Sequence, residues 1–370
     1  MASTTGRRHI AKITFTMTTP DDDGREVFMT GNFNGWQTHD PHYRMTRVGN
    51  GKFQYTLPLT PEIHFPLNYK YTKGNWDAEE IDASGVKTGN HELLLPKARV
   101  NDKIDRFLKD GQFTDIDFSP LIETVSDLFP IQSLHKRRRI RVLLPHNYHT
   151  SDQRYSVLYL QDAQNLWDKE APFGTWGIDE QLKKMAISNM NILMIVAIDH
   201  GDEERVIEFT PVQSPRIGKS EGRAYLKFIV RELKPYIDLH YRTLSARSDT
   251  GIGGSSMGGL ISIYAGLIYP EVFSKLMIFS PSLWVTQNVY LDAIQFQSYF
   301  PMRIYLYAGG KESTSMLPNI TKLKNIFEAK GYTSGDIAIK LSVNPSGGHS
   351  EKMWGGEFIP AVKWLFYSKS

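Results

Sequence analysis

The chain has 370 residues but no cysteine, no run of about 18 apolar residues and a net charge of only +3. Without cysteine, disulfides, thiol catalysis and a cysteine-ligated metal are excluded. Without a long apolar run, no helix is expected to span a membrane, and the small net charge does not argue for nucleic acid as a partner. The one basic run, Lys-Arg-Arg-Arg at 136–139, is interpreted as the solvated start of a strand over 140–144.

Residues 1–8 lack the apolar stretch of a signal peptide. This favours a cytoplasmic protein, although an exported protein whose leader is missing from the sequence would begin in the same way. The length predicts two domains, or one large domain with an appendage, and an apolar content of 41% suffices for a sizeable core. Nothing in the composition bears on the oligomeric state.

The chemistry is expected to centre on Ser256. The stretch Gly-Ser-Ser-Met-Gly at 254–258 fits G-x-S-x-G, the sharp strand-to-helix turn that exposes a nucleophilic hydroxyl above an α/β sheet. A short strand is predicted over 249–253, and an apolar helix over 257–269, ended by Pro270. The alternative is a serine that only caps the helix. The context favours the nucleophile, and the two glycines suit a turn in which a Cβ would clash.

After residue 120, short apolar strands alternate with amphipathic helices, which is typical of a mostly parallel sheet covered on both faces. The strands are predicted over 140–144, 156–160, 192–198, 250–253, 275–279, 303–308 and 337–343, and the helices over 178–185, 223–237, 257–269, 317–330 and 357–366. Residues 97–119 are charged and non-periodic and are predicted to be a linker. The α/β domain is therefore assigned to residues 120–370.

A serine nucleophile needs a base to take its proton and an acid to orient that base. In the α/β-hydrolase arrangement, the order along the chain is serine, acid, histidine. His349 is the only histidine after Ser256, and it stands in a glycine-rich loop that follows a predicted strand. Glu312, just past another strand, is the preferred acid. Asp336 is also in order, but it precedes its strand and is expected at the wrong end of the sheet.

The negative oxygen of a tetrahedral intermediate needs preorganised N–H donors. The first is expected to be the amide of Met257, directly after the nucleophile. The second is expected in the loop 161–168, which follows the strand over 156–160, and the amide of Gln164 is preferred. Other polar residues of this loop are explained equally well by turn formation.

Residues 1–96 are expected to form a small all-β domain, because short alternating runs separated by Gly, Asn, Asp and Pro fill this part of the chain. Within it stand Gly-Asn-Phe-Asn-Gly-Trp at 31–36, Tyr-Lys-Tyr at 69–71 and Gly-Asn-Trp at 74–76. Their spacing resembles the starch- and glycogen-binding modules of the immunoglobulin-like sandwich type. Indole faces stack on sugar rings, and the resemblance implies glucan contacts from Trp36, Lys70, Trp76 and Asn90. The alternative is that both tryptophans only pack against the sandwich core or the neighbouring domain.

Several further motifs stand in order across residues 120–370: the loop 161–168, Asp-His-Gly at 199–201, Glu-Phe-Thr-Pro at 208–211, Tyr-Arg-Thr at 241–243, the glycine-rich stretch 254–259, Ser-Pro-Ser-Leu-Trp at 280–284 and Gly-His at 348–349. Together they resemble the putative-esterase family of α/β-hydrolases, which includes esterase D, enterochelin esterases, and feruloyl and acetylxylan esterases. The resemblance implies a serine esterase with Ser256, His349 and an acid at the position of Glu312. Two positions depart from the family's pattern: Ala163 stands where glycine is common, and Glu312 where aspartate is common.

The leading interpretation is hydrolysis of a small-molecule carboxylic ester through an acyl-enzyme on Ser256, with no cofactor and no metal. A trilactone esterase for ferric siderophores would favour basic residues near the pocket, for which the candidates are Arg205, Lys219 and Arg223. A feruloyl or acetylxylan esterase targeted to polysaccharide is a further alternative.

From a different class, the N-terminal domain could be the functional part, with the hydrolase domain as a scaffold; the intact pair of Ser256 and His349 argues against this. A metal hydrolase built on Asp199, His200 and Asp202 is disfavoured, because this short cluster gives no tetrahedral ligand set.

Overall fold

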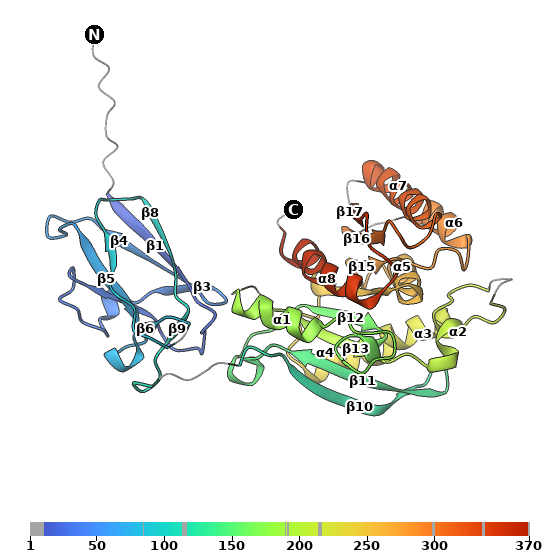
Figure 1. Cartoon of the computed structure of the whole chain (residues 1–370), viewed down its shortest axis with the longest axis horizontal. Coiled ribbons are helices and arrows are strands. Elements are labelled where there is room, and N and C mark those ends of the chain that lie inside the picture. The colour runs from blue at the N-terminus through green and yellow to red at the C-terminus, as the bar shows by residue number, and fades with distance from the viewer. Residues whose placement is uncertain are drawn as a thin grey trace, which may run out of the picture. The chain divides into compact units, whose positions relative to one another are not determined.

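The computed structural model describes residues 11–83, 85–112, 117–188, 190, 192–213, 217–297, 300–334 and 337–368. These residues divide into two compact units, whose main boundary lies between Phe118 and Ser119 (Figure 1). The N-terminal unit, before this boundary, is all-β, and the C-terminal unit, after it, combines a large sheet with helices.

The N-terminal unit contains two small sheets that share one apolar core. Their strand orders are β3-β4-β1-β8 and β2-β5-β7, with β6 and β9 as a separate short pair. The strands are β1 Lys12–Thr18, β2 Phe28–Gly31, β3 Thr46–Gly49, β4 Lys52–Pro58, β5 Leu67–Thr72, β6 Glu80–Ile81, β7 His91–Leu93, β8 Arg99–Lys103 and β9 Arg106–Phe107. Alternate residues of β1 are buried, and Phe15 meets Tyr69 of β5 edge to face with ring centroids 5.2 Å apart. The two inner faces therefore form a sandwich.

The predicted linker over 97–119 is wrong in its first part. Within it, β8 pairs in parallel with β1, and β9 pairs with β6. Phe107 is buried in the core of the N-terminal unit, whereas the residues of β8 alternate between exposed and half-buried. A short strand with charged residues on its outer face lacks the apolar run by which strands are recognised in a sequence. The N-terminal unit therefore extends beyond residue 96.

The C-terminal unit is built on a sheet of eight strands in the order β10-β11-β13-β12-β14-β15-β16-β17. Its strands are β10 Leu121–Ile131, β11 Lys136–Leu144, β12 Val157–Gln161, β13 Met194–Ile198, β14 Thr250–Ser255, β15 Lys275–Phe279, β16 Met302–Gly309 and β17 Ile337–Asn344. β11 is antiparallel to both of its neighbours, and all pairs from β13 to β17 are parallel. This mostly parallel sheet confirms the α/β-hydrolase fold that the sequence predicts.

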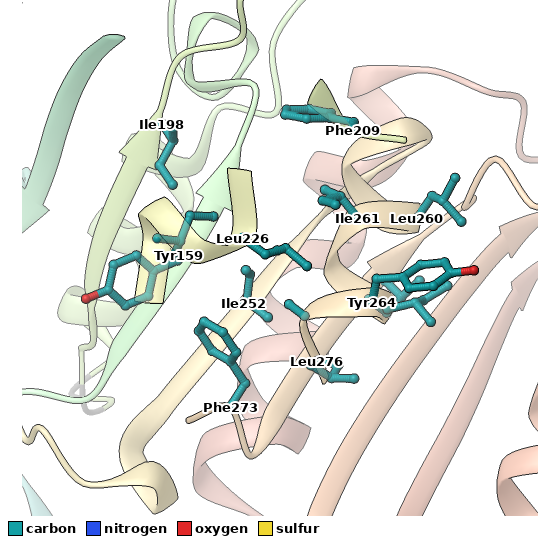
Figure 2. Packing of buried hydrophobic residues seen from close by; sticks show 14 of the residues in the cluster. Tyr159, Ile198, Phe209, Leu226, Ile252, Leu260, Ile261, Tyr264, Phe273 and Leu276 are labelled. Carbon is teal, nitrogen blue, oxygen red and sulfur yellow. The ribbon is translucent and has the colours of Figure 1, made fainter. Parts of the chain in front are cut away.

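Helices cover both faces of this sheet. They are α1 Ile178–Ile187, α2 Arg205–Glu208, α3 Gly222–Phe228, α4 Lys234–His240, α5 Met257–Ile268, α6 Asn288–Gln295, α7 Met316–Ser334 and α8 Glu351–Val362, with π-helical turns η6 Ile229–Leu233 and η8 Lys363–Tyr367. On one face, side chains of α3 and α5 pack onto Ile252 of β14 and Leu276 of β15 (Figure 2). On the other, Phe279 of β15 stacks on Trp176, which precedes α1, with centroids 5.3 Å apart.

The basic run at 136–139 is solvated at alternate residues only, because Arg137 and Arg139 are exposed whereas Lys136 and Arg138 are half-buried. Arg138 binds the carboxylate of Glu208, whose side chain is fully buried. Lys136 binds the same carboxylate and that of Glu221, and these acids, with burial opposing them, raise its pKa. Lys136 and Arg138 therefore serve to pair acids near the helical layer, whereas Arg137 and Arg139 keep the exposure that the sequence predicts.

The close approach of β14 and β15 predicts that a larger residue at Gly253 destabilises the protein. A Cβ on Gly253 would lie 2.6 Å from the carbonyl oxygen of Met277, a backbone atom of the adjacent strand. We expect Gly253→Ala to lower the free energy of unfolding by about 1–3 kcal/mol, measured by chemical denaturation. Gly356→Ala in α8 is the matched control: no atom lies within 4 Å of its Cβ position. Because alanine favours helix, it should be neutral or stabilising by up to about 1 kcal/mol. Equal midpoints for the two variants would contradict the close approach.

Candidate active site

Ser256 joins β14 to α5 through a backbone conformation that is rare outside glycine, with φ 55° and ψ −118°. Hydrogen bonds fix this conformation: the Ser256 N–H donates to the carbonyl of Phe279 (2.9 Å), and the Ser256 carbonyl accepts from the N–H of Ser282 (3.0 Å). A Cβ on Gly254 would lie 3.0 Å from the carbonyl carbon of Gly258. The turn thus has the backbone shape that G-x-S-x-G predicts, and glycine is needed where its two arms meet.

The Ser256 hydroxyl is half-buried and shares a hydrogen bond with the hydroxyl of Ser282, 3.1 Å away. Ser282 itself is buried and lies in the loop after β15. Among the described residues, no hydrogen bond joins the Ser256 hydroxyl to His349. Such bonds are often long in ligand-free enzymes and shorten when substrate binds. In this structure, therefore, a second serine is the partner of the predicted nucleophile.

His349 and Glu312 lie together, as the predicted pair of base and acid requires. Nδ1 of His349 is 2.8 Å from Oε2 of Glu312. An ionised carboxylate can only accept hydrogen bonds, so this contact places the imidazole proton on Nδ1 and leaves Nε2 as the acceptor of the neutral ring. The Glu312 side chain is almost completely buried, whereas His349 is 41% exposed. The alternative acid Asp336 lies outside the described residues.

Three donors surround the Glu312 carboxylate. Besides His349 at Oε2, Oε1 accepts from the hydroxyl of Ser280 (2.6 Å) and from the backbone N–H of Gly309 (2.6 Å). Burial by itself would raise the pKa of Glu312, but the donors outweigh it and the pKa lies below its usual value. Glu351, the first residue of α8, shows the opposite balance, since burial raises its pKa. Glu312 therefore keeps its charge in a buried place.

The two amides predicted as oxyanion donors lie at the starts of short helical segments. Met257 begins α5, where the amides of the first turn have no acceptor within the helix. Gln164 lies in a single 3-10 turn after β12, and its side chain is anchored to the backbone of His200. Its Nε2 donates to the His200 carbonyl (3.2 Å), and its Oε1 accepts from the His200 N–H (3.0 Å). The roles of both amides remain predictions.

The loop that carries Gln164 is tied down by an ion pair. Asp162 has a left-handed backbone (φ 59°), and its carboxylate binds the Arg205 guanidinium through two bonds of 2.6 and 2.7 Å. Burial opposes the charge of Arg205, but the Asp162 carboxylate outweighs it and raises the pKa of this side chain. Lys219 is likewise paired, with Glu221 at 2.5 Å. Two of the three basic residues considered for an anionic substrate are thus paired with acids of the chain, and the third, Arg223, is exposed.

In the N-terminal unit, the predicted sugar contacts are only partly brought together. Trp36 and Trp76 are neighbours with ring centroids 6.3 Å apart, and Trp76 is 42% exposed. Asn90 is exposed, directly before β7. Lys70 does not join an exposed platform: its ammonium is buried, donates to Glu79 (2.9 Å) and to the carbonyl of Thr88 (2.7 Å). The prediction of Lys70 as a sugar contact is therefore wrong, because an internal salt bridge holds it.

The Asp199, His200 and Asp202 cluster is occupied by other interactions. The Asp199 carboxylate binds Arg139 and Arg141. Within the described ranges, no group of three or more His, Cys, Asp or Glu side chains is placed to hold a metal ion. No helix in the part of the chain that the structure describes is long and apolar enough to cross a membrane.

Comparison with known proteins decides the family. The model of the family described as "Putative esterase" matches residues 131–365, which is more than half of the chain and covers both the serine turn and the pair of His349 and Glu312. The chain belongs to this family. The protein is accordingly an esterase, and the family resemblance seen in the sequence is confirmed.

Three further proteins show what the chain is similar to in sequence or in fold. The esterase is 27% identical over 251 residues to the uncharacterized protein YbbA of Bacillus subtilis (strain 168), covering 63% of this chain and 95% of that protein. A 91-residue segment is 33% identical to an alpha-amylase of Niallia circulans, covering 24% of this chain but only 7% of the amylase. Among solved structures, the enterobactin esterase FES from Shigella flexneri shares the fold over 95% of this chain and 92% of its own, with 16% identity and a TM-score of 0.53.

Four residues of the site carried no assigned role in the sequence-based prediction. Ser280 and Ser282 stand inside a family motif, whereas no motif in the sequence contains Trp354 or Glu351. Their contacts join positions that are far apart in the chain: the hydrogen bond between Trp354 and Ser280 spans 74 residues. The motif Ser-Pro-Ser directly after a buried strand was the one signal that pointed to two of them.

The lowered pKa of Glu312 predicts a pH dependence of stability. Its unfolded value is about 4.3, so the ionised form stabilises the folded esterase above that pH, and the contribution is lost as the pH falls through the lower folded-state pKa. The difference in unfolding free energy between wild type and Glu312→Gln, measured with urea, should shrink as the pH falls below about 4.5. A difference that grows as the pH falls below about 4.5 would contradict the direction of the shift.

Proposed function

We propose that the protein hydrolyses carboxylic esters through an acyl-enzyme on Ser256, with His349 as general base and Glu312 as the acid that orients it. The observation that carries this proposal is the combination of a strained serine turn with a buried, ionised glutamate on Nδ1 of the one histidine downstream of that serine. A surface histidine would not need such a partner, and a serine that only caps a helix would not need positive φ.

The proposed reaction uses the geometry as follows. Nε2 of neutral His349 takes the Ser256 proton while Oγ attacks the ester carbonyl, and the amides of Met257 and Gln164 receive the negative oxygen. The imidazolium then protonates the leaving alcohol. In the second half of the reaction, His349 takes a proton from water as the water attacks the acyl-enzyme, and the imidazolium returns that proton to Ser256 Oγ as the acid leaves. The negative charge of Glu312 stabilises the imidazolium at both steps.

The charges near the site bear on which class of ester is hydrolysed. An anionic ferric trilactone would be drawn by free cations near the pocket, but Arg205 and Lys219 are each bound to a carboxylate of the chain. The pairing of Arg205 favours a neutral ester, whereas the exposed Arg223 keeps the trilactone among the candidate substrates. Feruloyl and acetylxylan esters remain candidate substrates. One panel separates the classes: p-nitrophenyl esters of short and long acids, methyl ferulate, acetylated xylan and a ferric trilactone.

Ser256→Ala is expected to abolish hydrolysis of every substrate in this panel. Loss of the covalent step should lower kcat by about 10³-fold or more, and His349→Ala should be about as severe. The double variant should be no worse than either single variant, because the two groups act as a unit. Steady-state kinetics on the best p-nitrophenyl ester measures all three. Circular dichroism is the control for folding, since removal of a half-buried hydroxyl leaves little cavity.

Retention of more than about a tenth of wild-type activity by folded Ser256→Ala would sink the nucleophile assignment. An organophosphate provides an independent check, because it should inactivate the wild type with one label on Ser256. The label is read by mass spectrometry of the peptide that contains 254–258. A label elsewhere would point to another nucleophile.

A second candidate function, glucan binding, is favoured by the adjacent indoles of the N-terminal unit. Trp76 is 42% exposed beside Trp36, and Asn90 is exposed as well. The exposed indole of Trp76 beside the half-buried Trp36 suits stacking on sugar rings. This function would deliver the esterase to a polysaccharide, while the alternative role for the two indoles is packing within the protein.

If the indoles bind glucan, the intact protein should be retained on insoluble starch, and replacing both Trp36 and Trp76 by Ala should release it. Hydrolysis of a small soluble ester should be unchanged, because stacking on the polysaccharide makes no contact with the transition state. Sedimentation with starch granules measures retention. No retention of the wild type, or a loss of ester hydrolysis and thermal stability together in the double variant, would instead assign the indoles to packing.

A further inference from the structure

The Glu312 carboxylate is held by a chain of polar contacts that leads away from His349. Ser280, fully buried directly after β15, has its hydroxyl 2.6 Å from Oε1 of Glu312. On its other side, Nε1 of Trp354 in α8 lies 2.9 Å from the same hydroxyl oxygen. Strand β15, the loop after β16 and helix α8 thus meet at one buried serine.

The direction of both hydrogen bonds follows from the groups involved. Indole Nε1–H can only donate, and an ionised carboxylate can only accept. The Ser280 hydroxyl must therefore accept from Trp354 and give its single proton to Glu312. A hydroxyl that could otherwise rotate freely is fixed in the direction that serves the carboxylate, and hydrogen bonds to a charged group in a buried site are strong.

The backbone at Ser280 gives independent support for a role of this hydroxyl. Its φ is 44°, in the left-handed region that disfavours side chains other than glycine, and its N–H donates to the carbonyl of Tyr307 (2.8 Å). A glycine would meet this backbone requirement without strain. The chain instead carries a serine here, at a conformational cost that the contact with Glu312 accounts for.

Trp354 connects the acid and the base. Its ring contacts that of His349 edge to face, with centroids 4.8 Å apart and planes at 87°. The indole is 3% exposed and packs against Trp176, with centroids 6.2 Å apart. One rigid side chain therefore contacts the imidazole directly and reaches the carboxylate through Ser280.

We propose that Ser280 and Trp354 are positioning residues: Trp354 orients the Ser280 hydroxyl, and that hydroxyl fixes the Glu312 carboxylate in the orientation that holds His349. The inference rests on the proposed function, in which His349 is the base. Neither residue is assigned a contact with the ester, so both act on the rate only through the pair of Glu312 and His349.

A double-mutant cycle tests this inference. Ser280→Ala and Ser280→Gly both remove the hydroxyl, and the glycine variant also suits the left-handed backbone, so a folded variant is obtained even if alanine is poorly tolerated. Each should lower kcat by about 10-fold or more, with KM changed by less than about 2-fold. In the Glu312→Gln background, the same substitutions should lower kcat by less than about 2-fold, because the carboxylate they position is gone.

Trp354→Phe keeps a ring against His349 but removes the Nε1–H donor, so kcat should fall by about 3-fold or more, again only when Glu312 is present. The matched control is Ser274→Ala: Ser274 is also buried and stands at the opposite end of β15, away from the site. It should leave kcat unchanged.

The outcomes separate the two proposals. If Ser256→Ala stays active, the proposed function fails. If Ser256→Ala is inactive but the Ser280 variants have wild-type kcat, or lose the same factor with and without Glu312, only the positioning inference is overturned. Wild-type kcat for Trp354→Phe alongside a defect in the Ser280 variants would overturn the part assigned to the indole.

Discussion

The left-handed backbone of Ser256 is the constraint on which the rest of the C-terminal unit depends. A conformation of this kind costs on the order of 1–3 kcal/mol and persists only where neighbours hold it. Here the holding bonds come from Phe279 and Ser282, at the end of β15 and in the loop that follows it. The close spacing of β14 to β15, with glycine at 253 facing Met277, brings those partners within reach. The packing of β14 against β15 therefore fixes the turn that presents the Ser256 hydroxyl.

The electrostatics of the site follow from the number of donors that each carboxylate receives. Glu312 and Glu351 both sit near His349 and both lose solvation. Glu312 is surrounded by three donors from different elements, and its pKa falls. Burial dominates at Glu351, although its carboxylate accepts from its own backbone N–H and, at 3.4 Å, from Asn165, and its pKa rises. Proximity to the histidine thus does not set the direction of the pKa shift; burial and the surrounding donors do.

Local patterns in the sequence predicted the C-terminal fold well and the polar contacts of the site poorly. The apolar runs that form β12, β13, β15 and β16 are easily recognised in the sequence, because strands buried on both faces are continuous apolar stretches. β10 was missed, since it lies at the sheet edge with most residues at least partly exposed and with shifts in its register. The G-x-S-x-G motif and the order along the chain pointed to Ser256 and His349, and the place just past a strand pointed to Glu312. The contacts of Ser280 with Trp354 could not, because only the fold brings residues 74 positions apart together.

The N-terminal unit shows why a residue type at the expected spacing does not fix its role. Lys70 stands between the two tryptophan motifs as a sugar-binding lysine would, yet its ammonium is buried against Glu79, which also binds Lys87. Of the four predicted sugar contacts, the other three are the two tryptophans and the exposed Asn90. Stacking recognises the apolar face that many hexoses share, whereas discrimination between hydroxyl configurations comes from placed donors and acceptors. A platform of Trp36 and Trp76 alone would therefore bind glucans broadly and weakly, and would hold the esterase near a polysaccharide without selecting which ester it meets.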